Sequence, residues 1–186
     1  MLCIIFSLSA LYSIRGQNSH FSADIKHTVS GKPADWKSIT HAKYRVVFFM
    51  LPYCPMCKSY VQDMNKIASQ YKADSIYFVA IVSQKTVQKD ELDDFLDNNP
   101  IKIPIYTDHS MKITRHYKID TAPTVAVIND YHEVLYYGSI DNRLEDLGKK
   151  RTVITQYYLT DVLQALMNNE PILTPKTKPI GCLVED

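Results

Sequence analysis

Residues 44–57 read YRVVFFMLPYCPMC, and this stretch decides the fold. Its first part, Tyr44–Leu51, is a continuous apolar, β-branched and aromatic run, which is typical of a strand buried on both faces. After a short break, apolar side chains recur at three- and four-residue steps over residues 56–71, which predicts an amphipathic helix. A buried strand therefore runs directly into two cysteines, Cys54 and Cys57, at the beginning of a helix.

The rest of the chain continues this alternation of strands and helices. The sequence predicts strands over residues 75–82, 124–128 and 133–137, helices over 86–98, 110–117 and 155–168, and a short extended segment at 103–106. Strands that alternate with helices imply parallel pairing through crossover helices, whereas the last two strands, joined by a short turn, predict an antiparallel hairpin at one edge. We therefore expect an α/β fold with a central mixed sheet flanked by helices.

Three segments are expected along the chain. Residues 1–16 contain an apolar run of the length found in signal peptides, although no positive charge precedes it. Residues 17–170 form one domain, with a single short element expected around Trp36, and residues 171–186 form an irregular, proline-rich tail that contains Cys182. A signal peptide predicts a periplasmic or secreted protein that needs no membrane after cleavage, in a compartment where disulfides persist.

Composition excludes some classes of function. The 186 residues carry 21 Lys and Arg against 20 Asp and Glu, so the formal net charge is only +1. This balance gives no electrostatic reason to expect a nucleic-acid partner. The 4 cysteines are too few for a disulfide scaffold at this length, and a bridge between positions three residues apart would close a loop too small to add much stability. The spacing of Cys54 and Cys57 therefore favours chemistry over structural support.

The position of these two thiols explains the chemistry expected of them. A thiol reacts as its thiolate, and a helix N-terminus favours negative charge. Cys54 lies just before the helix and is expected to be the more exposed nucleophile that attacks a disulfide. Cys57 lies one turn further along the same face and is expected to be the more buried thiol that resolves the mixed disulfide. No cofactor is expected.

Alternatives remain for the cysteines. A structural zinc site needs four ligands, and the sequence offers neither a second Cys pair nor closely spaced His residues, so no metal site is expected. A purely structural role for the Cys54–Cys57 pair also remains open. Three roles stay open for Cys182: a third redox thiol that bridges to Cys54 or Cys57, a thiol that binds a partner, or an inert residue of the tail.

The strand, the Cys54-Pro55-Met56-Cys57 run and the following helix resemble the active-site unit of the thioredoxin superfamily. A second resemblance is Thr121-Ala122-Pro123-Thr124 before a strand, which is similar to the cis-proline loop of that superfamily. The resemblance implies a cis peptide bond at Pro123 and a substrate backbone that pairs beside Ala122 and Pro123. Tyr53, where thioredoxins usually carry Trp, and Pro55 are expected to contact the substrate as well.

A narrower resemblance covers most of the chain. Residues 137–143, the last helix and the Gly181-Cys182 tail are similar to the peroxiredoxin-like redoxins. True peroxiredoxins have a Thr where this chain has Leu51, so peroxidase activity is the less favoured alternative. The resemblance implies a thiol–disulfide oxidoreductase that exchanges disulfides with protein thiols and with an upstream redox donor or acceptor. A peroxide reductase that uses Cys54 and a non-enzymatic copper(I)-binding module are the other two hypotheses.

Overall fold

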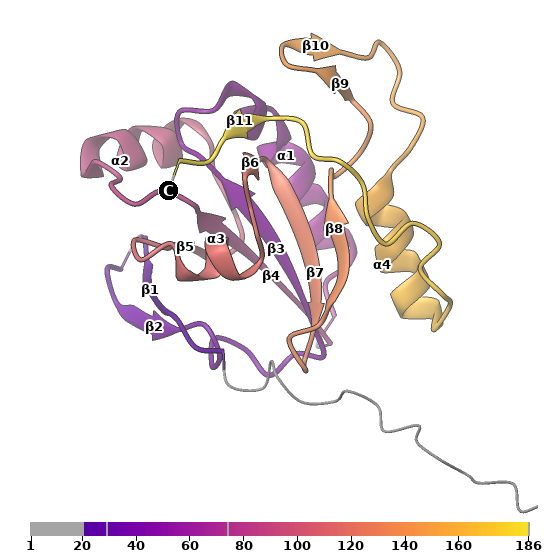
Figure 1. Cartoon of the computed structure of the whole chain (residues 1–186), viewed down its shortest axis with the longest axis horizontal. Coiled ribbons are helices and arrows are strands. Elements are labelled where there is room, and N and C mark those ends of the chain that lie inside the picture. The colour runs from indigo at the N-terminus through magenta and orange to yellow at the C-terminus, as the bar shows by residue number, and fades with distance from the viewer. Residues whose placement is uncertain (1–20, 29, 74, 186) are drawn as a thin grey trace, which may run out of the picture.

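The computed structural model describes residues 21–28, 30–73 and 75–185 and has the fold shown in Figure 1. The helices are α1 (Pro55–Gln70), α2 (Lys89–Asn98), α3 (Lys112–His116) and α4 (Tyr158–Asn168). The strands are β1 (Asp24–His27), β2 (Pro33–Asp35), β3 (Tyr44–Met50), β4 (Ile76–Val82), β5 (Ile105–Thr107), β6 (Thr121–Ala122), β7 (Thr124–Asn129), β8 (Val134–Gly138), β9 (Leu144–Asp146), β10 (Lys149–Lys150) and β11 (Cys182–Leu183). The predicted α/β class with a mixed central sheet is confirmed.

The main sheet has seven strands in the order β2-β1-β5-β4-β3-β7-β8. Strands β3, β4 and β5 are parallel, as their crossover helices require, and β3 pairs with β4 along its whole length from Tyr44↔Ile76 to Met50↔Val82. Strand β7 pairs antiparallel with both β3 and β8, so the predicted hairpin lies at one edge. The central position of β3 places its carboxyl end, and therefore the two cysteines, in the middle of the molecule.

Two apolar layers cover the faces of this sheet. Successive side chains of β3 point to opposite faces, so Val46 and Phe48 pack in one layer while Val47 and Phe49 pack in the other. The first layer contains the buried residues of α1, α2 and α4. The second contains α3 and the fully buried Trp36. Figure 1 shows α3 on the near side of the sheet and α1 on the far side.

Four expectations about local structure were wrong. The segment before β3 contains two strands, β1 and β2, which extend the sheet by a second antiparallel edge. Helix α2 begins at Lys89 rather than at residue 86. The polar stretch before α4 contains the small β9–β10 hairpin. The tail is not irregular throughout, because β11 pairs with β6. In the three cases that involve strands, the deciding contact is a backbone pairing with a distant or weakly patterned segment, which periodicity does not report.

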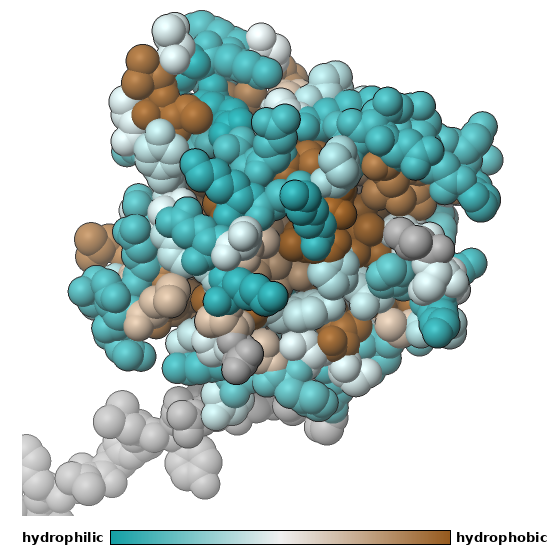
Figure 2. All heavy atoms as spheres, turned by 180° about the vertical axis from the view of Figure 1, so that it is seen from behind, coloured by the Kyte–Doolittle hydropathy of each residue, from teal (hydrophilic) through white to brown (hydrophobic). Residues whose placement is uncertain are grey.

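The β9–β10 hairpin projects from the domain in Figure 1 and lies at the upper left in Figure 2, where hydrophobic residues occur on its surface. Leu147 and Val153, in and after this hairpin, are 65% and 66% exposed. Across the described residues, no helix has the length and hydrophobicity needed to span a membrane. The predicted signal peptide at residues 1–16 lies outside the described residues.

Candidate active site around Cys54 and Cys57

Cys54 is the N-cap residue of helix α1 and so lies just before the helix, as the sequence predicts. Its N–H donates to the Leu51 carbonyl oxygen at 3.1 Å, which forms the tight turn at the end of β3, and its carbonyl oxygen accepts the Lys58 N–H at 3.1 Å, which is the first bond of the helix. Pro55 occupies the first helical position, where a missing N–H costs no hydrogen bond. The Cys54 side chain makes no capping hydrogen bond to the N–H groups of the first helical turn.

Cys57 is the free thiol of the site and is fully buried. The Leu51 N–H donates to its Sγ at 3.4 Å. Burial raises the pKa of the Cys57 thiol to about 12, because the charged thiolate loses its solvation; the backbone hydrogen bond from Leu51 lowers the pKa and offsets only part of this effect. Cys57 is therefore held as a protonated, protected thiol, which agrees with the predicted buried position of the resolving cysteine.

The loop opposite the cysteines has the expected form. The Ala122-Pro123 peptide bond is cis, and both residues are buried. Thr124 Oγ donates to the Thr121 carbonyl oxygen at 2.6 Å and so fixes the turn before β7. The carbonyl oxygen of Ala122 lies 3.5 Å from Cys54 Sγ, so the loop and the cysteine are in contact.

Cys54 does not have the exposure predicted for it. Its Sγ is bonded to Sγ of Cys182, 128 residues further along the chain, and the Cys54 residue is 0% exposed. A sulfur in a disulfide has no proton to donate, so its approach to the Ala122 carbonyl oxygen is a contact rather than a hydrogen bond. Of the roles left open for Cys182, the structure shows the bridge to Cys54, and Cys57 lies beside this bridge as a free thiol.

The tail reaches Cys54 as an extended strand. Cys182 pairs with Ala122 and Leu183 with Thr121, and the Val184 N–H donates to the Asp120 carbonyl oxygen at 3.0 Å. Gly181 lies directly against the loop: a Cβ at this position would be 2.0 Å from the Ala122 carbonyl oxygen. Only glycine fits at this close approach of the two backbones. The backbone edge that the family resemblance assigns to a substrate is thus occupied by the chain's own tail.

The earlier part of the tail is held on β8. The Tyr137 N–H donates to the Pro175 carbonyl oxygen at 3.1 Å, and the Thr177 N–H donates to the Tyr137 carbonyl oxygen at 2.9 Å. Thr177 Oγ accepts the Ser139 N–H at 2.8 Å and also lies 2.8 Å from the hydroxyl of the buried Tyr136. These contacts anchor the tail at residues 175–177, shortly before Cys182.

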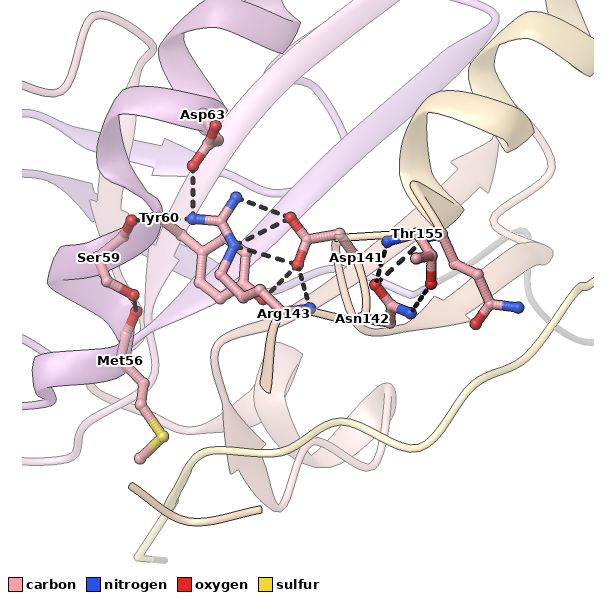
Figure 3. Close-up of polar contacts among 9 residues, drawn as sticks. Met56, Ser59, Tyr60, Asp63, Asp141, Asn142, Arg143 and Thr155 are labelled. Atoms are coloured by element: carbon pink, nitrogen blue, oxygen red, sulfur yellow. Dashed lines mark hydrogen bonds and ion pairs between the residues drawn. The ribbon is translucent and has the colours of Figure 1, made fainter. Parts of the chain in front are cut away.

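An ionic cluster joins helix α1 to the loop after β8 (Figure 3). Asp141, which is 4% exposed, accepts hydrogen bonds from Tyr60 Oη at 2.8 Å and from the Arg143 guanidinium at 2.7 Å. Arg143 also pairs with Asp63 at 2.7 Å, and its guanidinium carbon lies 4.2 Å from the Tyr60 ring centre. Burial, together with the Asp141 charge, raises the pKa of Tyr60, so its hydroxyl stays protonated and donates.

Sequence reasoning did not assign this cluster a role. Asp141 and Arg143 belong to the 137–143 stretch that carries the resemblance to redoxins, which was the available signal. Their partners Ser59, Tyr60 and Asp63 lie in the first turns of α1, shortly after Cys57. The cluster therefore fixes the end of the helix that carries the cysteines.

The two remaining predicted substrate-binding residues, Tyr53 and Pro55, flank Cys54 in the sequence. Tyr53 is 45% exposed, and Pro55 is exposed at the helix start. A groove of about 860 Å³ runs between residues 117–121 and residues 175–179, and none of the three described cysteines lines it. Among the described residues, no group of three or more His, Cys, Asp or Glu side chains has metal-binding geometry.

The chain resembles known proteins in sequence. The sequence profile of the family named Redoxin matches residues 18–153, which is most of the chain. The chain belongs to the redoxin family. Among curated redoxin relatives, the thiol-disulfide oxidoreductase ResA of Halalkalibacterium halodurans is 28% identical over 86 residues, which are 45% of this chain and 46% of that protein. Sporulation thiol-disulfide oxidoreductase A of Bacillus subtilis is 24% identical over 90 residues, 48% of this chain and 54% of that protein. This redoxin thus matches about half the length of each relative.

Solved structures confirm the thioredoxin-like fold of this redoxin. An uncharacterized conserved protein from Geobacillus kaustophilus superposes with a TM-score of 0.78 at 16% identity, covering 92% of this chain and 91% of that one. The StoA structure from Bacillus subtilis superposes with a TM-score of 0.53 at 19% identity, covering 63% of this chain and 86% of that one. The low identities limit this likeness to the fold.

Proposed function

We propose that this redoxin is a thiol–disulfide oxidoreductase in which Cys54 and Cys57 exchange disulfides with the thiols and disulfides of partner proteins. Cys54 is the attacking thiol when reduced, and Cys57 resolves the mixed disulfide. The names of the two curated relatives support this class of reaction. Because only about half of each relative is matched, the substrates and partners of this chain are part of the proposal. An upstream redox donor or acceptor restores the pair after each cycle.

The observation that carries the proposal is the bond that Cys54 already makes. Its sulfur, at the N-terminus of α1 and in contact with Ala122, is joined to a cysteine of an extended segment that pairs with β6. This is the arrangement of a mixed disulfide between an oxidoreductase and a bound peptide. Tyr53 and Pro55, exposed on either side of Cys54, are the other surfaces that a partner protein would meet.

Other hypotheses have weaker support. Leu51, which is 0% exposed, stands where a peroxide-orienting hydroxyl would be needed, so peroxide reduction is not proposed. Copper(I) binding would require the Cys54 thiolate, which the bridge to Cys182 consumes. A periplasmic or secreted location fits a protein that holds a disulfide, and it remains part of the proposal.

The test is reduction of insulin disulfides by the full chain in the presence of a dithiol. Wild-type protein is expected to accelerate precipitation of the insulin B chain, whereas C54S falls to the rate of the dithiol alone and C57S, which lacks the proposed resolving thiol, is slower than the wild type. Q62A, an exposed substitution on the same helix, should match the wild type. Wild-type protein that is no faster than the dithiol alone would refute the proposal.

A further inference from the structure

We propose that residues Gly181–Val184 are an internal substrate of this redoxin, and that the protein alternates between a closed form with a Cys54–Cys182 disulfide and an open form with a Cys54–Cys57 disulfide. This inference rests on the proposed exchange chemistry and adds a third redox-active thiol and a substrate class to it. The closed form is the one described above, in which the tail occupies the strand edge where an extended partner would pair.

The conversion between the forms requires no external oxidant. Cys57 loses its proton to solvent, and its thiolate attacks Sγ of Cys54. The Cys54–Cys182 bond breaks, its electron pair moves to Sγ of Cys182, and Cys182 takes up a proton. One disulfide and one thiol are present before and after the step, so no net oxidation occurs. Cys54 and Cys57 lie three residues apart at the start of α1, so their side chains share one face of the helix.

Non-covalent contacts hold the tail independently of the disulfide. The pairs Cys182↔Ala122 and Leu183↔Thr121 and the Val184–Asp120 hydrogen bond form a short strand, and Thr177 anchors the preceding segment on β8. Cys182 is therefore kept near Cys54 at high local concentration after the bond breaks. A partner must displace this strand in order to pair with β6, which makes the tail a competitor for partner binding.

The same contacts indicate which partners can displace the tail. Pairing with β6 requires an extended segment, and the close approach at Gly181 leaves no room for a Cβ before the cysteine, because that atom would lie 2.0 Å from the Ala122 carbonyl oxygen. The side chain of the residue after the cysteine, Leu183, is 75% exposed and so is not selected. The preferred substrate is thus a protein disulfide whose reactive cysteine follows a glycine in an exposed, extended segment.

Peptide reduction by the full-length C182S protein tests the substrate class. The probe is the disulfide-linked dimer of Pro-Ile-Gly-Cys-Leu-Val, the sequence of residues 179–184, and the matched control probe has Ala in place of Gly. Because a methyl group forced into this packed contact weakens binding of the Ala probe, reduction of the Gly probe is expected to be about tenfold faster or more. Equal rates for the two probes would refute the preference for glycine before the reactive cysteine while leaving the exchange activity intact. No reduction of either probe would refute the proposed function itself.

Disulfide mapping of the intact chain tests the internal switch. Oxidised C57S should contain the Cys54–Cys182 disulfide, C182S the Cys54–Cys57 disulfide, and wild-type protein both. G181A retains all cysteines and is expected to shift the wild-type mixture toward Cys54–Cys57 by about tenfold, whereas L183A, which alters an exposed side chain of the same strand, should not. Absence of the Cys54–Cys182 disulfide from C57S, or an unchanged mixture in G181A, would overturn the proposal.

Discussion

Two segments meet at the sulfur of Cys54, and they are held there by different means. Residues 44–57 form a central strand and a helix start, whose structure follows from local patterning and from pairing along the full length of β3. Residues 175–185 have no helix and only two residues of strand, and they are held by a few backbone bonds to β6 and β8. The first segment is a rigid platform, and the second is a strap whose attachment can be changed by single substitutions.

The difference shows how one site can be both buried and reactive. The platform buries Cys57 completely and keeps it protonated, which protects this thiol from reaction with molecules in solution. The strap buries Cys54 only as long as the tail stays docked. Local opening requires few broken contacts in the tail, whereas opening the platform would disrupt the central sheet. Control of the site is therefore expected to lie in the tail.

The largest expected effect is the pH dependence of the rate at which Cys57, buried by the platform, attacks the Cys54–Cys182 disulfide. Only the thiolate of Cys57 attacks, and burial raises its pKa to about 12, so its ionised fraction increases about tenfold per pH unit below that value. The conversion from closed to open form should therefore accelerate about 100-fold between pH 7 and pH 9. Tyr53, the titratable neighbour whose charge interacts with Cys57, has a raised pKa and stays neutral over this range.

This rate is measured by acid quenching of the oxidised wild-type protein at timed intervals, followed by disulfide mapping. A rate that levels off near pH 8 would mean that Cys57 titrates as an ordinary thiol and that the platform does not protect it.

The next effect concerns the strap where it crosses β8. Gly138 has φ +152°, and a Cβ there would lie 2.0 Å from Thr177 Oγ and 2.8 Å from the Thr177 nitrogen. G138A should therefore release residues 175–179, which we expect to see as at least tenfold faster amide hydrogen exchange at Thr177. Gly148 also has a positive φ, +72°, but a Cβ there would meet nothing within 4 Å. G148A thus controls for backbone strain and should leave the exchange rate at Thr177 unchanged; similar acceleration in both variants would argue against the contact.

A third prediction concerns how helix α1, which continues from the platform, is fixed to the loop after β8. Asp141 and Asp63 both pair with Arg143 at 2.7 Å, but the Asp141 side chain is 4% exposed and that of Asp63 is 37% exposed. D141N should lower the free energy of unfolding by about 2–4 kcal/mol, because it leaves a partly buried guanidinium without its main partner. D63N should cost less than about 1 kcal/mol. Denaturant unfolding of the two variants measures the difference, and equal losses would contradict the role given to burial.

The smallest effect concerns one hydroxyl under the strap. Tyr136 Oη donates to the Ser139 carbonyl oxygen at 2.6 Å and lies 2.8 Å from Thr177 Oγ. Y136F removes these bonds without changing the ring and should destabilise the protein by about 1–2 kcal/mol. The test is thermal unfolding together with hydrogen exchange at Ser139, whose N–H is bonded to the same Thr177 oxygen. Unchanged exchange at Ser139 would show that the hydroxyl does not support the tail.

Much of the fold could be predicted from the sequence because its strongest elements are locally patterned. The buried run at β3 and the helix period of α1 predicted the central strand and the cysteine-bearing helix, and the resemblance to the thioredoxin superfamily implied the cis Ala122-Pro123 bond; all three are confirmed. The edge strands β1 and β2 were missed because short strands of mixed polarity carry no clear period. The cluster of Asp141 and Arg143 with α1 was missed because its partners are about 80 residues apart.

By itself, the sequence determined where the two neighbouring cysteines lie, because a buried strand, a break and an amphipathic helix are each defined by the order of residues within one segment. Only the tertiary structure decided which cysteine is bonded to which. Cys182 reaches Cys54 because β6 presents an unpaired edge, β8 anchors Thr177 and Gly181 allows two backbones to touch. Such pairing joins segments that are distant in the chain, and it depends on their shapes in three dimensions rather than on any local pattern.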